Sequence, residues 1–251
     1  MLKASHLTVR YGRRTVVDDL SFSLEEGQWL MLCGPNGAGK SSLVSALSRL
    51  VPCTGTVTLD GRDVRALKPG ALAQRMGVLS QHNHVGYDYT VEEIVRLGRY
   101  AHRRGFLSSQ DADGEKQVER ALALTGMTEL RHQSVLTLSG GERQRAFLAQ
   151  VFAQDPQLLI LDEPANHLDL IYQKHVFSLI AEWLKTPGRA VLSVVHDLSL
   201  ARMYGTHALL LHEGRCAAQG ALADVLTPDK LQSVYGMDVH GWMRSLLTQW
   251  E

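Results

Sequence analysis

The sequence predicts an α/β domain whose central sheet is mostly parallel, with an N-terminal antiparallel β subdomain and an inserted α-helical subdomain. The first observation is that apolar runs at residues 158–161 and 190–195 are separated by a helical pattern at 170–184. Strands that are apolar throughout are typical of a parallel sheet covered on both faces. The second is a glycine-rich loop between a strand and a helix at residues 34–41. The third is a helical pattern at about residues 90–154, which indicates an insertion.

The N-terminal part of the chain is predicted to be rich in β-strands over residues 2–33. Residues 7–9 and 15–17 flank a turn at Tyr11-Gly12, and residues 18–24 alternate between apolar and polar side chains, as half-buried strands do. Two further short strands are predicted at residues 55–61, closed by Asp60-Gly61, and at residues 77–81, ending in Gln81.

The predicted helical block begins with residues 91–97 behind Thr90, a residue type favoured at helix N-caps. Helical patterns continue at residues 115–125 and 143–154. We expect one domain over residues 1–251, divided into four residue ranges. These are an α/β core with the β subdomain (1–85 and 154–220), the helical subdomain (86–153) and a helical tail (221–251). Three amphipathic pieces of the tail, at 222–226, 231–235 and 246–250, are expected to pack on the core.

Composition and charge exclude several classes of protein. The 251 residues are 45% apolar, enough for an ordinary core. Lys and Arg together count 26, as do Asp and Glu, so the basic excess of a nucleic-acid-binding protein is missing. No apolar run reaches the length of a membrane span, and the first residues lack the apolar core of a signal peptide. Three cysteines without metal-ligand spacing indicate reduced thiols, and His82 and His84 alone do not indicate a metal site.

The most informative segment fits the phosphate-binding pattern G-x-x-x-x-G-K-[ST]. An apolar strand at 29–33 precedes it, and a helical pattern at 42–50 follows. Glycines allow successive backbone N–H groups to point inward, and the helix N-terminus adds partial positive charge. Lys40 can reach the β- and γ-phosphates, and the Ser41 hydroxyl can bind Mg²⁺. The predicted phosphate-binding residues are Gly34, Pro35, Asn36, Gly37, Ala38, Gly39, Lys40 and Ser41.

Three further groups of residues follow strands or open a helix. Asp162 and Glu163 end an apolar strand, where ligands bind in such sheets; alone they could equally form a solvated acidic turn. We expect Asp162 to hold Mg²⁺ and Glu163 to orient and deprotonate the attacking water. His196 ends another strand and is predicted to hydrogen-bond the γ-phosphate. Residues 138–142 form a second glycine-rich helix N-terminus, where Ser139 is able to cap the helix and donate to a phosphate.

At these residues the chain resembles the ATP-binding cassette (ABC) family, through six ordered motifs within residues 11–196. Residues 34–41 look like its Walker A, 138–142 its LSGGE signature, and 158–163 its Walker B with the catalytic glutamate. Shorter matches are Gln81 to the Q-loop, Leu168-Asp169 to the end of the D-loop, His196 to the H-loop, and Tyr11 to the aromatic residue that stacks on adenine. Two departures are small: Ser42, beside the α-phosphate, replaces a frequent Thr, and the D-loop reads Ala165-Asn166-His167-Leu168-Asp169.

The resemblance implies an ATPase that uses ATP and Mg²⁺ in a two-fold, head-to-tail homodimer. Catalytic roles fall on Lys40, Gln81, Glu163 and His196, and Mg²⁺ contacts on Ser41, Gln81 and Asp162. The binding site of each nucleotide would be completed by four residues of the other chain: Ser139, Gly140, Gly141 and Asp169. Further implied partners are two transmembrane permease subunits and an extracytoplasmic substrate-binding protein, without nucleic acid. The chain would lie peripherally on the cytoplasmic face of the inner (plasma) membrane, with the permease docked near residues 82–105, including Arg99 and Arg103.

Softer matches suggest the transported solute. Residues 166–169, 90–99 and 234–239 look like those of importers of iron-siderophores, haem or cobalamin. Three alternatives remain: the cassette of an ABC exporter, a soluble ABC ATPase without a transport role, and a nucleotide-gated module that does not hydrolyse ATP. The intact Asp162-Glu163 pair argues against the last, and the neutral charge argues against a nucleic-acid role.

Overall fold

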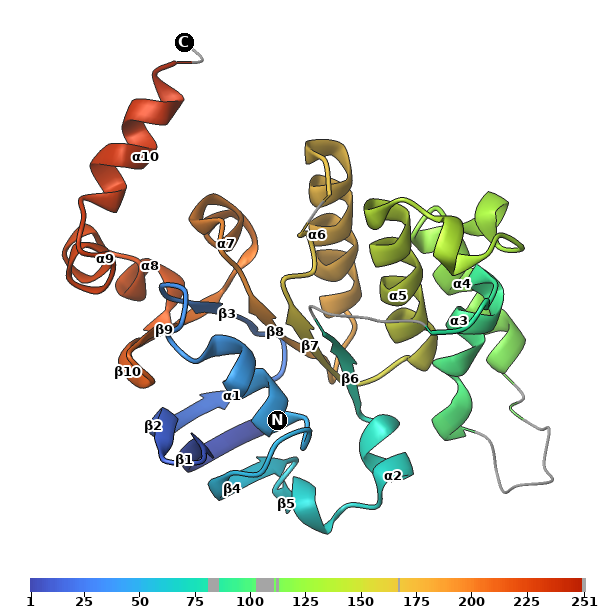
Figure 1. Cartoon of the computed structure of the whole chain (residues 1–251), viewed down its shortest axis with the longest axis horizontal. Helices are drawn as coiled ribbons and strands as arrows, with labels where there is room; N and C mark the ends of the chain where they lie inside the picture. The colour runs from blue at the N-terminus through green and yellow to red at the C-terminus, as the bar shows by residue number, and fades with distance from the viewer. Residues whose placement is uncertain (81–85, 103–110, 112, 167, 250–251) are drawn as a thin grey trace. The chain divides into compact units, whose positions relative to one another are not determined.

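The computed structural model describes residues 1–80, 86–102, 111, 113–166 and 168–249 (Figure 1). The chain forms two compact units. The first comprises Met1–Arg65 and Leu192–Glu251, and the second comprises Ala66–Val191. Both units combine strands with helices, which confirms the predicted α/β class. No helix in the described ranges has the length and apolar character needed to cross a bilayer.

The N-terminal sheet of the first unit has four antiparallel strands in the order β2-β1-β4-β5. Strand β1 (Leu2–Tyr11) turns at Gly12 into β2 (Arg14–Leu24), so that Tyr11 pairs with Arg14, as predicted. Strand β4 (Thr54–Leu59) pairs with β1 and joins β5 (Arg62–Asp63) through Asp60 and Gly61, both at positive φ. The antiparallel β subdomain is therefore confirmed.

A second set of strands in this unit includes β3, which leads into helix α1. Strand β3 (Trp29–Cys33) is buried throughout, pairs in parallel with β9 (His207–His212), and β9 pairs antiparallel with β10 (Arg215–Ala221). The end of β8 (Ala190–Val194) is fixed beside β3, because the Trp29 ring nitrogen donates to Ser193 Oγ at 2.9 Å. Helices α1 (Lys40–Leu47) and α7 (Leu198–Tyr204) follow β3 and β8.

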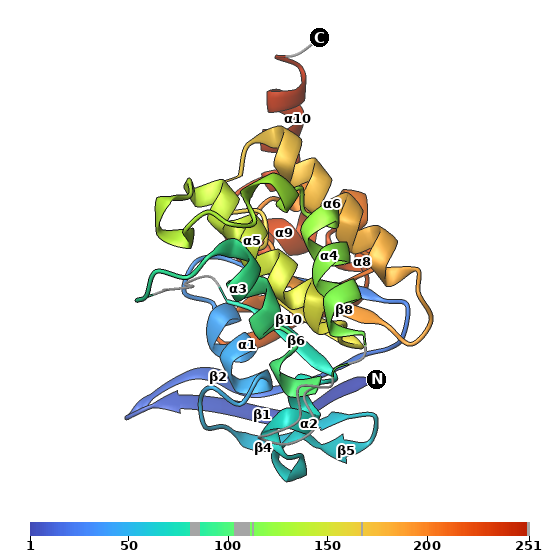
Figure 2. The ribbon, with the colours of Figure 1, turned by 90° about the vertical axis from the view of Figure 1, so that its right-hand side faces the viewer.

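The C-terminal tail forms three helices that differ in burial. Helix α8 (Leu222–Val225) and helix α9 (Pro228–Tyr235) bury the apolar residues of the first two predicted amphipathic pieces. Helix α10 (Val239–Leu247) extends from α9 toward the C-terminus (Figures 1 and 2). Leu246 is 43% exposed and Leu247 is 66% exposed. The expectation that the third piece packs on the core is therefore wrong for these residues of the isolated chain, and Trp250 lies outside the described residues.

The second unit contains parallel strands β6 (Met76–Leu79) and β7 (Leu158–Asp162). Its chain enters through α2 (Pro69–Ala73), and helix α6 (Leu170–Leu184) spans the residues predicted for it. The beginning of β8 lies near β7, because Ala190 N–H donates to Gln157 O at 3.0 Å. The parallel pairings in both units agree with the predicted mostly parallel sheet.

The helical part of the second unit packs α3 (Val91–Leu97), α4 (Gly114–Leu124) and α5 (Gly140–Gln154) against one another. Thr90 and Glu93 form the expected cap of α3 as a reciprocal capping box. Glu92 accepts from Arg96 and Arg131 and joins these helices to the segment before α5. Short 3₁₀ helices occupy Val64–Ala66, Tyr100–His102, Thr128–Leu130 and Val135–Thr137. The four-part division into residue ranges stays a prediction.

Candidate functional site

The loop after β3 has a backbone that only glycine fits at two positions. Gly34 has φ +143°, and an added Cβ would lie 2.2 Å from the carbonyl oxygen of Leu211. Gly39 has φ +100°, and its Cβ would lie 2.6 Å from the carbonyl oxygen of Val16. Gly37 also has positive φ, at +80°, but an added Cβ there would meet nothing within 4 Å. The loop is thus pinned at its two ends and open at its centre, as a phosphate cradle requires.

Lys40 is 6% exposed and folds back over the loop that precedes it. Its Nζ donates to Gly34 O at 2.8 Å and to Pro35 O at 2.9 Å. Lys40 also begins α1, whose N-cap residue Gly39 offers no side-chain cap and whose first turn carries no acidic residue. The first backbone N–H groups of α1 therefore have no carboxylate of their own helix to compete with a phosphate.

The other predicted site residues of the first unit lie in the first turn of α1 and at the ends of β1 and β8. Ser41 is exposed and Ser42 is half-buried in the first turn of α1. Tyr11 is 49% exposed at the end of β1, as an aromatic residue that stacks on a base needs to be. His196 is exposed between β8 and α7, where Asp197 caps α7 by accepting from Ser199 N–H at 2.7 Å.

The second unit holds the predicted carboxylates at the end of β7. Asp162 closes the strand and is 5% exposed. Glu163 adopts φ +56°, a left-handed conformation that costs a non-glycine residue about 1–2 kcal/mol. Asn166 supports this turn, since its N–H donates to Glu163 O at 3.1 Å and its Nδ2 donates to Glu163 Oε2 at 2.8 Å. The adjacent carboxylates therefore differ. Asp162 is a buried residue of the strand, whereas Glu163 lies in a turn and accepts a hydrogen bond from the Asn166 amide.

Helix α5 begins with a reciprocal cap at the predicted signature residues. Ser139 Oγ accepts from Glu142 N–H at 3.3 Å, and Glu142 Oε2 accepts from Ser139 N–H at 2.9 Å and from its hydroxyl at 2.8 Å. These hydrogen bonds lower the pKa of Glu142. The helix starts at Gly140, three residues earlier than residues 143–154 predicted, because this capping box extends it. Ser139 and Gly140 are exposed, so this N-terminus is open to solvent in the single chain.

Two further residues predicted for the site are Asp169 and Gln81. Asp169 is exposed and caps α6 by accepting from Tyr172 N–H at 2.9 Å. Gln81 lies outside the described residues, as do His82, His84, Arg103 and His167. The structure thus gathers Tyr11, residues 34–42 and His196 in the first unit, and Ser139–Gly141, Asp162, Glu163 and Asp169 in the second. No sequence motif indicated a role for Asn166 or Tyr235, although Asn166 lies in the D-loop stretch 165–169 and Tyr235 in the stretch 234–239.

Arg99 is not a surface residue. It is 7% exposed, its Nε donates to Asp111 Oδ2 at 2.7 Å, and its Nη2 donates to Asp111 Oδ1 at 2.9 Å. Its Nη1 donates to Ala153 O at 3.0 Å, near the end of α5. The Arg99 guanidinium is therefore bonded inside the helical block, whereas docking of the permease near residues 82–105 stays a prediction. Tyr100 and Leu97 are the exposed neighbours, at 72% and 48%.

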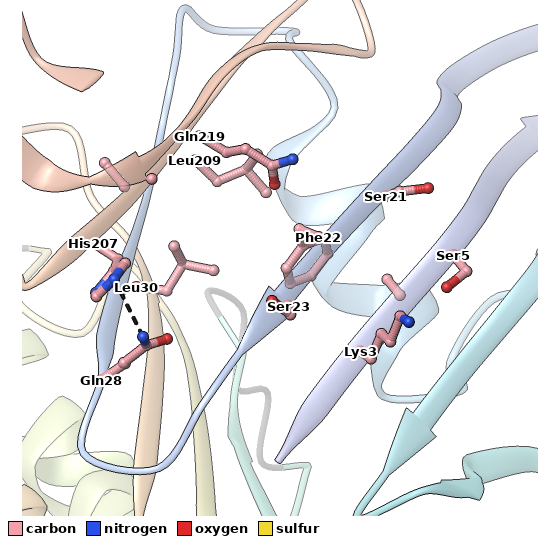
Figure 3. A pocket seen from close by; sticks show the side chains of 13 residues that line it. Lys3, Ser5, Ser21, Phe22, Ser23, Gln28, Leu30, His207, Leu209 and Gln219 are labelled. Atoms are coloured by element: carbon pink, nitrogen blue, oxygen red, sulfur yellow. Dashed lines mark hydrogen bonds between the residues drawn. The ribbon is translucent and has the colours of Figure 1, made fainter. Parts of the chain in front are cut away.

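A pocket of about 400 Å³ lies elsewhere in the first unit (Figure 3). Its lining includes Lys3, Phe22 and Gln219, and Gln28 Nε2 donates to His207 Nε2 at 3.2 Å across one wall. None of the predicted nucleotide-binding residues lines it.

Each of the two groups, taken by itself, offers residue types that suit a magnesium nucleotide. A serine hydroxyl and a carboxylate, Ser41 and Asp162, are hard oxygen ligands of the kind that Mg²⁺ prefers. The glycine loop, the buried Lys40 and the N-terminus of α1 together suit a polyphosphate.

Comparison with known proteins gives a consistent result. Residues 17–166 match the ABC transporter family. The chain is 39% identical over 237 residues to the ferric enterobactin transport ATP-binding protein FepC of Escherichia coli, covering 94% of this chain and 87% of that protein. It is 42% identical over 245 residues to the hemin import ATP-binding protein HmuV of Pseudomonas entomophila, covering 95% and 94%. The cobalamin import ATP-binding protein BtuD of Halobacterium salinarum is 36% identical over 235 residues, covering 93% and 58%.

Solved structures share the fold. A putative metal-chelate type ABC transporter in an inward-facing conformation matches with a TM-score of 0.80 and 26% identity, covering 94% of this chain and 89% of the matched one. A dimeric ATP-binding cassette bound to ADP and phosphate matches with a TM-score of 0.78 and 24% identity, covering 88% and 99%; at that identity it supports the fold alone.

Proposed function

Because the chain belongs to the ATP-binding cassette (ABC) transporter family, we propose that it is the ATP-hydrolysing subunit of an importer for an iron-siderophore, haem or cobalamin-type substrate. The substrate class is supported by relatives named for ferric enterobactin, hemin and cobalamin, each of which aligns with more than nine-tenths of this chain. The observation that carries the ATPase assignment is the glycine-pinned loop with Lys40 folded over it.

The phosphate cradle explains nucleotide binding in this proposal. Lys40 would exchange its contacts with Gly34 O and Pro35 O for phosphate oxygens, which carry a full negative charge and bind an ammonium more strongly than neutral carbonyls do. The first N–H groups of α1 and the open backbone at Gly37 would donate to the same phosphates. Ser42 would reach the α-phosphate, and Tyr11 would stack on adenine.

Hydrolysis in this proposal depends on the two carboxylates and on His196. Ser41, Asp162 and Gln81 would hold Mg²⁺, which neutralises developing charge on the phosphates when it is bound. Glu163 would accept a proton from the attacking water, and the hydrogen bond from Asn166 would orient its carboxylate. His196 would donate to the γ-phosphate and hold the water in line.

A homodimer is proposed because the chain offers two glycine-rich helix N-termini for one nucleotide. Ser139, Gly140 and Gly141 begin α5 in an exposed position, and the Ser139 hydroxyl and the first N–H groups would serve the nucleotide of a second copy. The γ-phosphate would then be held from both sides only in the closed dimer, so its hydrolysis would favour opening. Asp169 would lie at the same interface.

We further propose that two permease subunits receive this motion and that an extracytoplasmic binding protein delivers the solute. The permease would dock on the segment before and after α3, where Tyr87, Leu97 and Tyr100 are exposed at 74%, 48% and 72%. Such side chains are typical of docking surfaces, whereas Arg99 is held internally. The chain would then lie peripherally on the cytoplasmic face of the inner (plasma) membrane.

The test is isolation of this chain from its native membranes in mild detergent, followed by mass spectrometry of the proteins and small molecules that accompany it. Polytopic subunits with an iron chelate, haem or a corrinoid would support the importer. Polytopic subunits with an exported lipid or drug would favour an exporter cassette instead. Recovery only with soluble partners would overturn the transport role and leave the nucleotide site to be judged separately.

A further inference from the structure

Helix α9 of the tail reaches the phosphate cradle through a single hydroxyl group. The backbone N–H of Gly34, the first residue of the loop, donates to Tyr235 Oη at 3.1 Å. The two residues are 201 positions apart in the chain, and Tyr235 is the last residue of α9. We propose that Tyr235 is a positioning residue for nucleotide binding, which fixes the start of the phosphate cradle; this inference rests on the proposed ATPase function.

Tyr235 lies at the well-defined C-terminal end of the packed helix α9. Leu231 and Val234 on α9 are 4% and 5% exposed, so one face of the helix is packed. The helix stops directly after Tyr235, because Gly236 takes the left-handed conformation (φ +70°) and its N–H donates to Gln232 O at 2.9 Å. The phenol ring is therefore held on a packed element with a defined end rather than on a mobile loop.

Gly34 is held through both of its backbone polar groups. Its φ of +143° and the nearby Leu211 carbonyl leave it no room for a side chain, so backbone contacts alone set its orientation. Tyr235 holds its N–H, and Lys40 donates to its carbonyl at 2.8 Å. The two peptide groups that flank Gly34 are thus fixed from opposite ends, one by the tail and one by the lysine that is proposed to contact phosphate.

The chemistry of the hydroxyl suits a permanent contact. Burial raises the pKa of Tyr235 to about 12, and burial likewise raises the pKa of the neighbouring Cys33 thiol to about 12. The phenol and the thiol are consequently neutral at physiological pH, and the Tyr235 oxygen accepts from Gly34 without introducing a negative charge beside the phosphates. A phenylalanine at this position would keep the ring and lose the hydroxyl group that accepts from Gly34 N–H.

The matched test compares Tyr235→Phe, Val234→Ala and Lys40→Ala with the unchanged chain. Adenylyl imidodiphosphate with Mg²⁺ serves as a non-hydrolysable probe in calorimetric titrations, and the melting midpoint of each nucleotide-free protein is recorded. The Tyr235→Phe chain is expected to bind the probe about three- to tenfold more weakly, the range that one net hydrogen bond supports, with a melting midpoint lowered by less than that of Val234→Ala. Val234→Ala is expected to lower the melting midpoint and leave affinity unchanged.

The outcomes separate this inference from the proposed function. If Tyr235→Phe binds the probe as tightly as the unchanged chain does, the positioning role is overturned. Loss of binding in Lys40→Ala would in that case still support the assignment of the loop as the phosphate-binding site. If both Tyr235→Phe and Val234→Ala lose affinity in proportion to the fall in their melting midpoints, the effect comes from packing of α9. That result would also overturn the positioning role. If the unchanged chain binds no probe, the ATPase proposal itself fails. A turnover assay of Tyr235→Phe should show a raised KM for ATP with kcat within about twofold of the unchanged chain.

Discussion

The side-chain amide of Asn166 donates to Oε2 of Glu163 at 2.8 Å, across a turn in which Glu163 has φ +56°. The adjacent Asp162 is 5% exposed at the end of its strand, so two neighbouring carboxylates have separate environments. The amide hydrogen bond restricts the rotation of one carboxylate without neutralising it. A carboxylate held in this way is suited to accept a proton from a water molecule in one defined position.

Replacement of Glu163 by Gln is expected to preserve ATP binding and reduce turnover about 10²–10⁴-fold, because the base is lost while Asn166 keeps an oxygen acceptor. Steady-state release of phosphate and binding of ATP measure the two effects. Glu182→Gln, on exposed α6 surface, is the matched control and should retain normal turnover. Turnover of Glu163→Gln close to that of the unchanged chain would remove Glu163 from the role of base.

Replacement of Lys40 by Ala is expected to weaken ATP binding about 10–100-fold, which is the value of one charge-assisted contact. The rise in melting midpoint on adding Mg²⁺-ATP should then shrink, since stabilisation follows the ratio of ligand concentration to Kd. Lys3→Ala on β1 serves as the control for lost positive charge. Equal ATP affinity in the two variants would contradict the cradle assignment.

Replacement of Arg99 by Ala is expected to destabilise the helical part of the second unit by about 3 kcal/mol, because it leaves the Asp111 carboxylate and Ala153 O without the guanidinium. Arg120→Ala, on the exposed surface of α4, should change stability by less than about 0.5 kcal/mol. Melting midpoints followed by circular dichroism compare the two variants. A midpoint for Arg99→Ala at the value of the unchanged chain would return Arg99 to the list of docking candidates.

Acid is expected to weaken the same part of the chain. Hydrogen bonds from Arg131 and then Arg96 lower the pKa of Glu92 from 4.5 to about 2. A folded-state pKa below the unfolded one contributes stability that is complete above about pH 4.5 and is lost as pH falls toward 2. The difference in melting midpoint between the unchanged chain and Glu92→Gln should therefore be large at pH 6 and small near pH 2. Glu129→Gln on the surface is the control; a difference that stays constant with pH would show that Glu92 acts through packing alone.

The tail should divide into a part that stabilises the chain and a part that does not. Leu231→Ala on α9 is expected to cost about 2–4 kcal/mol, because its side chain is 4% exposed. Leu247→Ala on α10, 66% exposed, should cost less than about 0.5 kcal/mol in the isolated chain. Denaturant midpoints of both variants check this, and equal losses would mean that α10 is packed in solution.

Several elements of the fold were predictable because their causes are local. The turn between β1 and β2 follows from Tyr11-Gly12, the start of α3 from the Thr90 cap, and the phosphate loop from its glycine spacing. The start of α5 follows from Ser139, which the sequence indicated as a cap, whereas the helical pattern was assigned only from residue 143; the capping box outweighs the low helix propensity of the glycines at 140 and 141. Propensity acts residue by residue, while the cap acts on the whole first turn.

The amino-acid sequence alone determined the α/β class, the glycine-rich loop after β3 and the identity of the two carboxylates at the end of β7, since glycine conformation, strand length and the residue types at strand ends are properties of short segments. Tertiary structure alone decided which distant groups meet. It paired Arg99 with Asp111, left α10 exposed, and brought Tyr235 to the N–H of Gly34 across 201 positions. The physical reason is that periodicity specifies which face of an element is apolar, whereas the partner of a polar group is selected only when packing excludes water from the alternatives.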